Sequence, residues 1–434
     1  MAALWPNRIL AYKGNRLAEP GAGGEEIMAR DRTFVIAGAG HAGGRAAEAM
    51  RSQGFDGRIV LIGEENYPPY ERPPLSKELL RDDDGVERTF LNPAEFYAGK
   101  GIEHRPGVRV EGIEAAAHRL RLGDGETLGY DKLLLTTGGR VRRLTLPGAE
   151  LGGVHYLRGI DDSLAIRKAL VRDASIVIIG GGFIGLEVAA SARARGCAVS
   201  VVEMQDALLG RVADPEIGRL LADVHGAHGV EVLTGVGVER FEGADRVRRV
   251  VCSNGRALDA DAVIVGIGII PNADLAAEAG LEVDNGIVVD VFGQTSDADI
   301  HAAGDVANHP NPILGHRVRL ESWQNAQNQG IAVARNMCGA GAPYAEVPWF
   351  WSDQYDINLQ MAGAPQSWDR LVWRGDPASA RFIVFYMEGD VVVAVNAFNL
   401  GREVRIAKFL IERKTPVADA DLADEGIKLR DLAR

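Results

Sequence analysis

The sequence has few cysteines, no excess of basic charge and no long apolar run, and each shortage excludes a class of protein. Cys197, Cys252 and Cys338 are the only cysteines, and they form no C-x-x-C pair. We therefore expect neither a disulfide framework nor a metal site, and we expect a reducing, cytoplasmic location. The net charge of −12 argues against nucleic-acid binding. No stretch reaches the roughly 18 consecutive apolar residues of a membrane span, so we expect no membrane partner.

Glycine, in contrast, is abundant, and two of its clusters share one pattern. Gly38–Gly43 reads Gly-Ala-Gly-His-Ala-Gly, and Gly180–Gly185 reads Gly-Gly-Gly-Phe-Ile-Gly. Each cluster follows a short apolar run and precedes a stretch of helical pattern. An acidic residue, Glu64 or Glu203, then ends the next apolar run. Strand, glycine turn, helix and acid in this order are typical of a dinucleotide site.

Both glycine clusters suit a pyrophosphate group. The first glycine permits the tight turn, the second lets the backbone approach the phosphates, and the helix N-terminus supplies N–H groups and partial positive charge. Two such sites in one chain indicate two dinucleotides held face to face, most simply FAD and NADH. The expected ligands are Gly38, Gly40, Gly43 and Glu64 for FAD, and Gly180, Gly182, Gly185 and Glu203 for NADH.

Glu203 also predicts which nicotinamide dinucleotide is used. A carboxylate at this position accepts a hydrogen bond from a ribose 2′-hydroxyl but repels a 2′-phosphate. The next four residues, 204–207, add no cation that would bind a phosphate. We therefore expect NADH to be preferred over NADPH. Arg211 is expected to reach round to the adenosine, so this preference need not be absolute.

The order of elements repeats one plan twice. Each half ends in an apolar strand that runs into glycines, at residues 132–139 and again at 261–268. A duplicated Rossmann plan explains this repeat. It adds Thr137 and Gly138 to the expected FAD residues and Gly268 to the expected NADH residues. We predict an α/β fold with two Rossmann-like dinucleotide-binding domains, like the glutathione-reductase-like flavoproteins, plus a C-terminal α+β domain.

The predicted domains are discontinuous along the chain. Residues 31–143 and 270–345 form the FAD-binding domain, residues 144–269 the NADH-binding domain, and residues 346–434 the C-terminal domain. In the last of these we expect a hairpin over residues 382–398 and a final helix over 404–413. The prolines of residues 67–77 exclude a helix or central strand there. Residues 1–30 are expected to be a disordered extension.

Several longer strings are more selective than the glycine clusters: Tyr70–Lys77, Gly180–Glu187, Gly304–Asp305, Glu321–Ala326 and Pro348–Gln354. In this order they resemble the FAD-dependent, NADH-using ferredoxin reductases that serve bacterial cytochromes P450 and Rieske-type oxygenases. The resemblance implies an NADH:ferredoxin oxidoreductase of class EC 1.18.1 in the bacterial cytoplasm. Its acceptor would be a small, acidic [2Fe–2S] ferredoxin or a rubredoxin, and it would be a monomer or weak homodimer.

The resemblance also implies roles for single side chains. Lys77 lies beside the flavin and pairs with Glu187 near the nicotinamide, while Trp323 lies against the pyrimidine side of the flavin ring. These three are the expected catalytic residues, and all three also contact the cofactors. The resemblance places Arg72 in the loop beside the flavin. It implies that Asp305 holds the ribityl chain and that the ring of Phe183 shields the flavin. Each of three residues has a plainer alternative. Lys77 would be a solvated loop lysine, Glu187 a carboxylate on an exposed helix face, and Phe183 part of the core packing.

The docking surface for the acceptor is predicted from charge. Residues 401–414 contain five basic and two acidic side chains, a local charge of +3 in an acidic chain. A positive rim near the flavin would steer an acidic partner, and an ordinary charged helix face is the alternative. A disulfide reductase or peroxidase would need a cysteine before Cys197, where the loop offers Ser76. A signalling flavoprotein is the remaining, non-enzymatic alternative.

Overall fold

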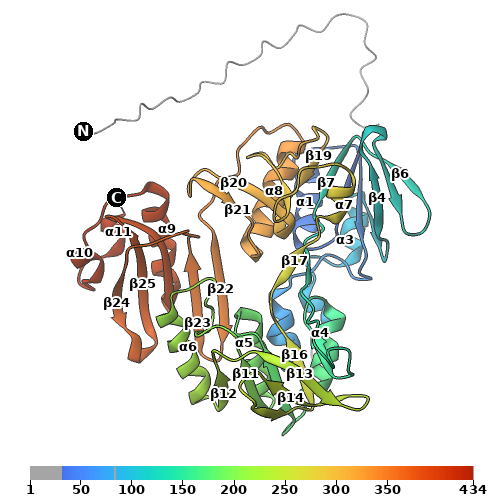
Figure 1. The fold of residues 1–434 in the computed structure, drawn as a ribbon. Helices are drawn as coiled ribbons and strands as arrows, with labels where there is room; N and C mark the ends of the chain where they lie inside the picture. Colours follow the sequence, from blue (N-terminus) through green and yellow to red (C-terminus); the bar gives the residue numbers. More distant parts are fainter. Residues whose placement is uncertain (1–31, 83–84, 434) are drawn as a thin grey trace, which may run out of the picture.

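The computed structural model describes residues 32–82 and 85–433, so the extension expected over residues 1–30 lies outside the described residues. Figure 1 shows two α/β units stacked one above the other, with a third, C-terminal unit alongside both. This is the predicted α/β class. Within the described ranges, no helix is long and apolar enough to cross a bilayer.

A five-stranded parallel sheet organises the first unit. Its order is β19 (Ile300–Ala302), β7 (Lys132–Leu135), β1 (Thr33–Ala37), β2 (Arg58–Gly63) and β3 (Ile102–Pro106). Phe34 and Ile36 pack with helices α1 (His41–Ser52) and α8 (Trp323–Met337). Val35 and Ala37 pack against the antiparallel strands β4 (Val110–Glu114), β5 (Arg119–Leu122) and β6 (Thr127–Gly129). Both faces are buried, which is why the strand is apolar throughout.

The second unit repeats this arrangement. Its parallel sheet has the order β12 (Val230–Leu233), β11 (Ala198–Val202), β10 (Ser175–Ile179), β16 (Ala262–Val265) and β9 (Val154–Tyr156). Ile176 and Ile178 face helices α5 (Phe183–Ala194) and α6 (Pro215–Ala227). Val177 and Ile179 face strands β13 (Val238–Gly243), β14 (Val247–Cys252) and β15 (Ala257–Asp259). The chain leaves the first unit along β8 (Gly139–Val141) and returns along β17 (Ile269–Pro271), which pair antiparallel.

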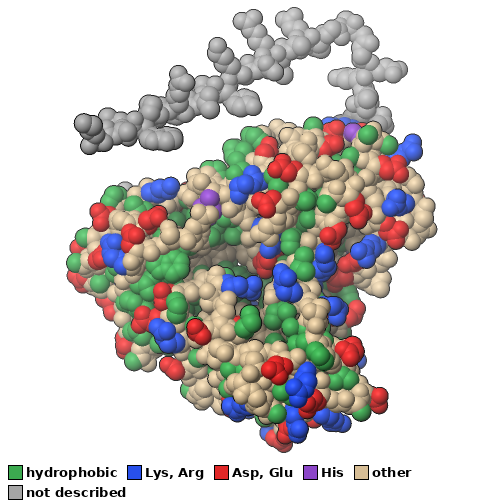
Figure 2. All heavy atoms as spheres, viewed as in Figure 1, with side chains coloured by type: hydrophobic (Ala, Val, Ile, Leu, Met, Phe, Trp, Pro, Cys, Tyr) green, Lys and Arg blue, Asp and Glu red, His purple; other side chains and the backbone are tan. Residues whose placement is uncertain are grey.

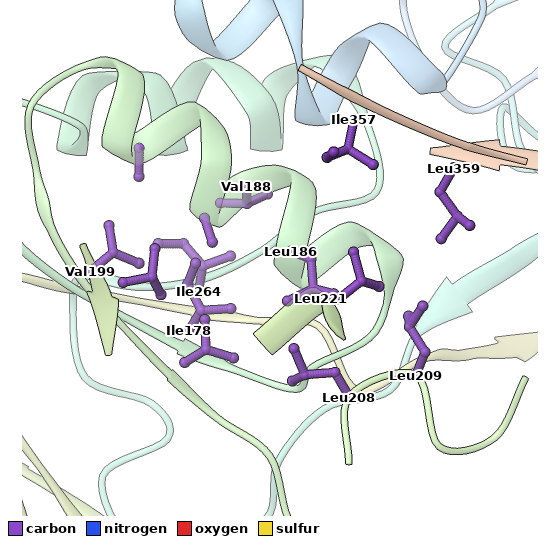
Figure 3. Packing of buried hydrophobic residues seen from close by; sticks show 14 of the residues in the cluster. Ile178, Leu186, Val188, Val199, Leu208, Leu209, Leu221, Ile264, Ile357 and Leu359 are labelled. Carbon is purple, nitrogen blue, oxygen red and sulfur yellow. The ribbon is translucent and has the colours of Figure 1, made fainter. Parts of the chain in front are cut away.

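The C-terminal unit is an antiparallel sheet with helices on one face. The strand order is β22 (Trp349–Gln354), β23 (Ile357–Ala362), β26 (Val391–Phe398), β25 (Arg381–Glu388) and β24 (Arg370–Asp376). Helices α9 (Gly401–Arg413), α10 (Asp419–Ala423) and α11 (Leu429–Leu432) cover one face. The other face packs on the second unit, where Ile357 and Leu359 approach Leu186 and Leu221 (Figure 3). This shared core fixes the C-terminal sheet against α5 and α6.

Short elements complete the fold and correct two expectations. They are η2 (Pro73–Ser76), α2 (Glu78–Arg81), η3 (Val86–Thr89), α3 (Ala94–Gly99), η4 (Ala115–Ala117), α4 (Ile160–Ala169), α7 (Asp274–Glu278), β18 (Ile287–Val288), η5 (Gly304–Val306), β20 (Ala307–Asn311), β21 (His316–Val318) and η6 (Pro377–Ser379). The expectation that residues 67–77 exclude helix was wrong, because a proline in the first turn of a helix needs no N–H donor. The helix over residues 404–413 is not the last, since α10 and α11 follow it and are too short to show a periodic pattern.

Candidate functional site

A cavity of about 2210 Å³ lies where the three units meet, and Figure 2 shows the molecule hollowed at this junction. Sites for one small ligand usually occupy roughly 300–1,000 Å³, so this cavity is large enough for two dinucleotides. Both glycine turns line it, with the proline loop, β22 and the start of α8. Every predicted site residue lines the cavity except Gly43 and Gly185.

The first glycine turn has the geometry that a phosphate cradle needs. Gly38 has φ +118°, and a Cβ there would lie 2.3 Å from the carbonyl oxygen of Thr136. A Cβ on Gly40 would meet nothing within 4 Å, so the backbone is open to the cavity. Gly40 precedes α1 and no side chain caps the helix. The first N–H groups of α1 are thus free to bind an anion.

The second glycine turn has the same geometry. Gly180 has φ +107°, and a Cβ there would lie 2.5 Å from the carbonyl oxygen of Gly266. Gly182 precedes α5, which again has no side-chain cap. The third glycine of each cluster lies beneath its helix, where a Cβ would be 2.0 Å (Gly43) or 2.2 Å (Gly185) from the carbonyl oxygen of the first glycine. The structure thus shows that Gly43 and Gly185 let each helix pack closely on its glycine turn, and their contact with a cofactor stays a prediction.

The two acidic residues differ in their surroundings. The carboxylate of Glu64 is exposed, with Arg109 Nε 3.9 Å away. The carboxylate of Glu203 accepts hydrogen bonds from two backbone N–H groups, those of Gly181 (2.7 Å) and Gln205 (2.7 Å). Glu203 thus braces the glycine turn itself, a role that its position in the sequence did not reveal. At the same rim, the guanidinium of Arg211 lies 3.2 Å from the position of a Cβ on Gly268.

A buried ion pair forms one wall of the cavity. Lys77 follows η2, and its Nζ lies 3.1 Å from Oε1 of Glu187 on α5, with side-chain exposures of only 7% and 3%. Glu187 also accepts hydrogen bonds from the hydroxyl of Ser76 and, at 2.7 Å, from that of Ser352 on β22. Burial raises the pKa of Glu187, and the Lys77 charge opposes that shift. The solvated-lysine and helix-face alternatives for this pair are therefore excluded.

A second charged group lines the cavity near the first glycine turn. Arg72 pairs with Glu65 (3.0 Å) and donates to the backbone carbonyl of Arg158. Arg158 in turn lies 3.3 Å from the carboxylate of Asp305 on η5. Burial and the nearby charge of Arg72 lower the pKa of Arg158, as expected where two cations are held close together. Sequence reasoning found Arg72 and Asp305 but not Arg158 or Glu65, which no motif marks.

Aromatic rings line the cavity beside the ion pair, where Lys77 Nζ lies 5.9 Å from the centre of the Trp351 ring. Trp323 begins α8, where the Ser322 hydroxyl caps the helix by accepting from a backbone N–H. The Trp323 ring meets that of Trp351 edge to face at 5.8 Å, and Trp351 stacks on Trp349 at 5.1 Å. Phe183 packs against Phe350 at 4.3 Å. Thr137 and Gly138 lie at the same junction, where the Thr137 hydroxyl donates to the carbonyl of Asn272.

The basic helix α9 begins next to this wall. Trp349 Nε1 donates to Gln360 Oε1 at 3.1 Å. A Cβ on Gly401, the first residue of α9, would lie 2.3 Å from Gln360 Nε2. Residues 401–414, which are α9 and the residue after it, carry five basic side chains. Arg402, Arg405, Arg413 and Lys414 are exposed, and Lys408 is half-buried.

Comparisons with known proteins agree with this arrangement. Residues 32–330 match the pyridine nucleotide-disulphide oxidoreductase family, and residues 349–433 match the reductase C-terminal family. The chain is 46% identical over 400 residues to the anthranilate 1,2-dioxygenase system ferredoxin–NAD(+) reductase component of Burkholderia cepacia, covering 92% of this chain and 98% of that one. It is 39% identical to putidaredoxin reductase of Pseudomonas putida, covering 93% and 97%.

A solved structure is also similar. The covalent putidaredoxin reductase–putidaredoxin complex superposes with a TM-score of 0.90 at 38% identity, covering 92% of this chain and 98% of that chain.

Proposed function

The chain belongs to the pyridine nucleotide-disulphide oxidoreductase family, and on that premise we propose that it carries electrons from NADH through FAD to a small, acidic [2Fe–2S] ferredoxin. It is an oxidoreductase of the ferredoxin–NAD(+) reductase class. The observation that carries the proposal is one cavity lined by two phosphate-cradling turns, a buried ion pair and a tryptophan. The proposed terminal acceptor is a cytochrome P450 or Rieske-type oxygenase.

The residues present fit both dinucleotides. Open backbone at Gly40 and Gly182, each before an uncapped helix, suits two pyrophosphates. We assign FAD to the first turn, with Glu64, Arg72 and Asp305 as its charged contacts. Further residues of this FAD set are Gly38, Thr137, Gly138 and Trp323. We assign NADH to the second turn, with Gly180, Phe183, Glu203, Arg211 and Gly268.

Both dinucleotides would meet at the Lys77–Glu187 pair. When bound, FAD supplies the exchange between hydride transfer and single-electron transfer. The ammonium of Lys77 offers positive charge where negative charge develops, and Glu187 holds that ammonium in place. The three tryptophans and Phe183 exclude water from this wall. None of the three cysteines, all of which lie among the described residues, lines the cavity, so a disulfide-reducing reaction lacks its nucleophile.

The proposed docking surface is the basic face of α9. It begins beside Gln360 and Trp349, and Trp349 lines the cavity. Its exposed arginines and lysine suit an acidic partner, whose approach they would accelerate at low salt. We further propose a monomer or weak homodimer in the bacterial cytoplasm, where the three free thiols of the chain would stay reduced.

Anaerobic stopped-flow spectroscopy tests the proposal. The yellow protein is mixed with NADH and then with an oxidised [2Fe–2S] ferredoxin. Rapid bleaching followed by fast reoxidation is expected. Rapid bleaching of the flavin with slow ferredoxin reduction would contradict the proposal that a ferredoxin is the acceptor. A flavin that NADH does not bleach would contradict the proposed NADH site.

A further inference from the structure

A chain of hydrogen bonds runs from Glu187 on α5 along strand β22 of the C-terminal sheet to His225 on α6. Ser352 Oγ lies 2.7 Å from Glu187 Oε1, and Gln354 Nε2 lies 3.0 Å from Ser352 Oγ. Gln354 Oε1 lies 2.8 Å from Nε2 of His225 on α6, and the Tyr355 hydroxyl lies 3.1 Å from His225 Nδ1. Ser352, Gln354 and His225 are each 0–1% exposed, so water does not compete for these contacts.

The donors and acceptors of this chain can be consistent in only two ways. A serine hydroxyl has one hydrogen. If the amide N–H of Gln354 donates to Ser352, that hydrogen is available for Glu187, and Glu187 is a pure acceptor. If the Gln354 amide turns over, Ser352 donates to its oxygen instead, and Glu187 must carry a proton to bond to Ser352. The orientation of one buried amide therefore decides how Glu187 is held.

The tautomer of His225 and the orientation of that amide are tied to each other. His225 Nε2 faces the Gln354 oxygen, so Nε2 must carry the proton and Nδ1 must accept from the Tyr355 hydroxyl. Burial lowers the pKa of His225, which keeps the ring neutral with a single ring proton to assign. Tyr355 holds a left-handed backbone, φ +56°, in the turn between β22 and β23. A tyrosine in that region is unusual, and the strain indicates that its position is fixed by its surroundings.

We propose that Ser352, Gln354, His225 and Tyr355 are positioning residues that direct every donor towards Glu187 and so keep it an ionised partner for Lys77. The alternative arrangement reverses every hydrogen bond, with a protonated Glu187 at one end and an Nδ1–H tautomer of His225 at the other. The protonation of Glu187 and the tautomer of His225 would then change together. The importance of this for the reaction rests on the proposed function, whereas the network itself does not.

Few other charged groups contact the two ends of the chain. Lys77, which directly precedes α2, is the charged group among the described residues that lowers the pKa of Glu187. At the other end, the charge of His228 lowers the pKa of His225, and the charge of Arg193 lowers the pKa of Tyr355. His228 stacks on Tyr355 at 3.7 Å, but its own hydrogen bond goes to the carbonyl of Val224, outside the chain. It therefore offers a matched control.

Nitrogen-15 NMR of histidine-labelled, FAD-containing protein tests the network directly. Loss of one signal in His225→Phe assigns the residue. At neutral pH we expect the Nε2–H tautomer of His225, and on acidification we expect it to give way to Nδ1–H as Glu187 takes up its proton. In Ser352→Ala the His225 tautomer should no longer follow Glu187. An Nδ1–H tautomer or an imidazolium at neutral pH would overturn the proposal.

The pKa of Glu187 is measured from the pH dependence of the rate at which NADH bleaches the flavin. One lost hydrogen bond to a charged group raises the pKa of the carboxyl by about one unit. Ser352→Ala should shift the acidic limb of the profile upward by about that much, and His225→Phe in the same direction by less. His225→Gln, which can donate to Gln354 from its own amide, should restore part of the loss, and His228→Phe should shift nothing.

Equal shifts in His225→Phe and His228→Phe would assign the effect to packing and refute the network. Failure of the proposed function is distinguishable, because a protein whose flavin is not bleached by NADH still reports its His225 tautomer by NMR.

Discussion

The buried pair of Lys77 and Glu187 allows a prediction whose magnitude follows from the structure. The perturbations are Lys77→Met, Glu187→Leu and the double variant. With side-chain exposures of 7% and 3% for the lysine and the glutamate, water does not replace a lost partner. Removing one member of such a pair leaves a buried charge, a loss of several kcal/mol. The surviving group limits this loss by changing its protonation state.

That limit can be calculated for each single variant. Without Lys77, Glu187 can take up a proton; from an ordinary glutamate pKa of about 4.3, this costs about 3–4 kcal/mol at pH 7. Without Glu187, a lysine with an ordinary pKa of about 10.4 can lose its proton at a cost of about 5 kcal/mol at pH 7. We expect the free energy of unfolding to fall by close to these amounts. The fall should be smaller for Lys77→Met, because the hydroxyls of Ser76 and Ser352 still donate to the carboxylate. The double variant leaves no charge and should lie within about 2 kcal/mol of the unmodified protein.

Urea unfolding of the FAD-containing protein, followed by circular dichroism, measures these differences. The pH dependence gives a second check. In Lys77→Met the folded pKa of Glu187 rises further above its unfolded value, so the penalty is absent below about pH 4 and grows as the pH rises. A double variant as unstable as the worse single variant would refute the account of a mutually compensating pair.

Three further predictions concern the glycine turns, the nucleotide preference and acid stability. Gly43→Ala should lower the free energy of unfolding by several kcal/mol, because its Cβ would lie 2.0 Å from a carbonyl oxygen, whereas Gly40→Ala should fold normally and bind FAD more weakly by fluorescence titration. Equal destabilisation by both would contradict the division of roles. Glu203→Lys should raise KM for NADH and narrow the gap to NADPH, and it should lower stability slightly because Gly181 N–H loses its acceptor; unchanged kinetics with both nucleotides would remove Glu203 from the site. Burial lowers the pKa of three histidines from 6.5 to about 4. Between these two pH values, unfolding should therefore take up as many as about three protons. This stability is complete above pH 6.5 and is lost as the pH falls towards 4, by about 3 kcal/mol for each histidine; they are His41, His301 and His309. Urea midpoints that stay constant between pH 6.5 and 5 would contradict this.

The parts of the site that were predicted are those set by local backbone geometry. A glycine with φ +118° and a helix that starts three residues later leave a mark in the sequence, because only glycine fits at the first position. The same holds for β1 and β10, whose unbroken apolar runs reflect burial on both faces. The third glycine of each cluster was recognised, but its packing under the helix was not foreseen, since packing under a helix and contact with a cofactor both favour glycine.

The parts that were missed depend on partners far apart in the chain. Arg158 reaches Asp305 across 147 positions, and Ser352 reaches Glu187 across 165, so no spacing rule can find either pair. The brace of Glu203 on Gly181 was missed for a different reason. The expected ribose contact already explained an acid at that position, and a second role leaves no further trace in the sequence.

Glu187 connects the three units through its carboxylate, which is buried although it lines the cavity where they meet. Its helix belongs to the second unit, Ser76 and Lys77 come from the first, and Ser352 comes from the C-terminal sheet. The carboxylate can be fully hydrogen-bonded only when all three units are in place. Because an unsatisfied buried charge costs several kcal/mol, any opening between the units is opposed at the residue nearest to the proposed meeting point of the dinucleotides. The charge pair that we propose for the reaction and the contact that holds the units together are therefore the same interaction.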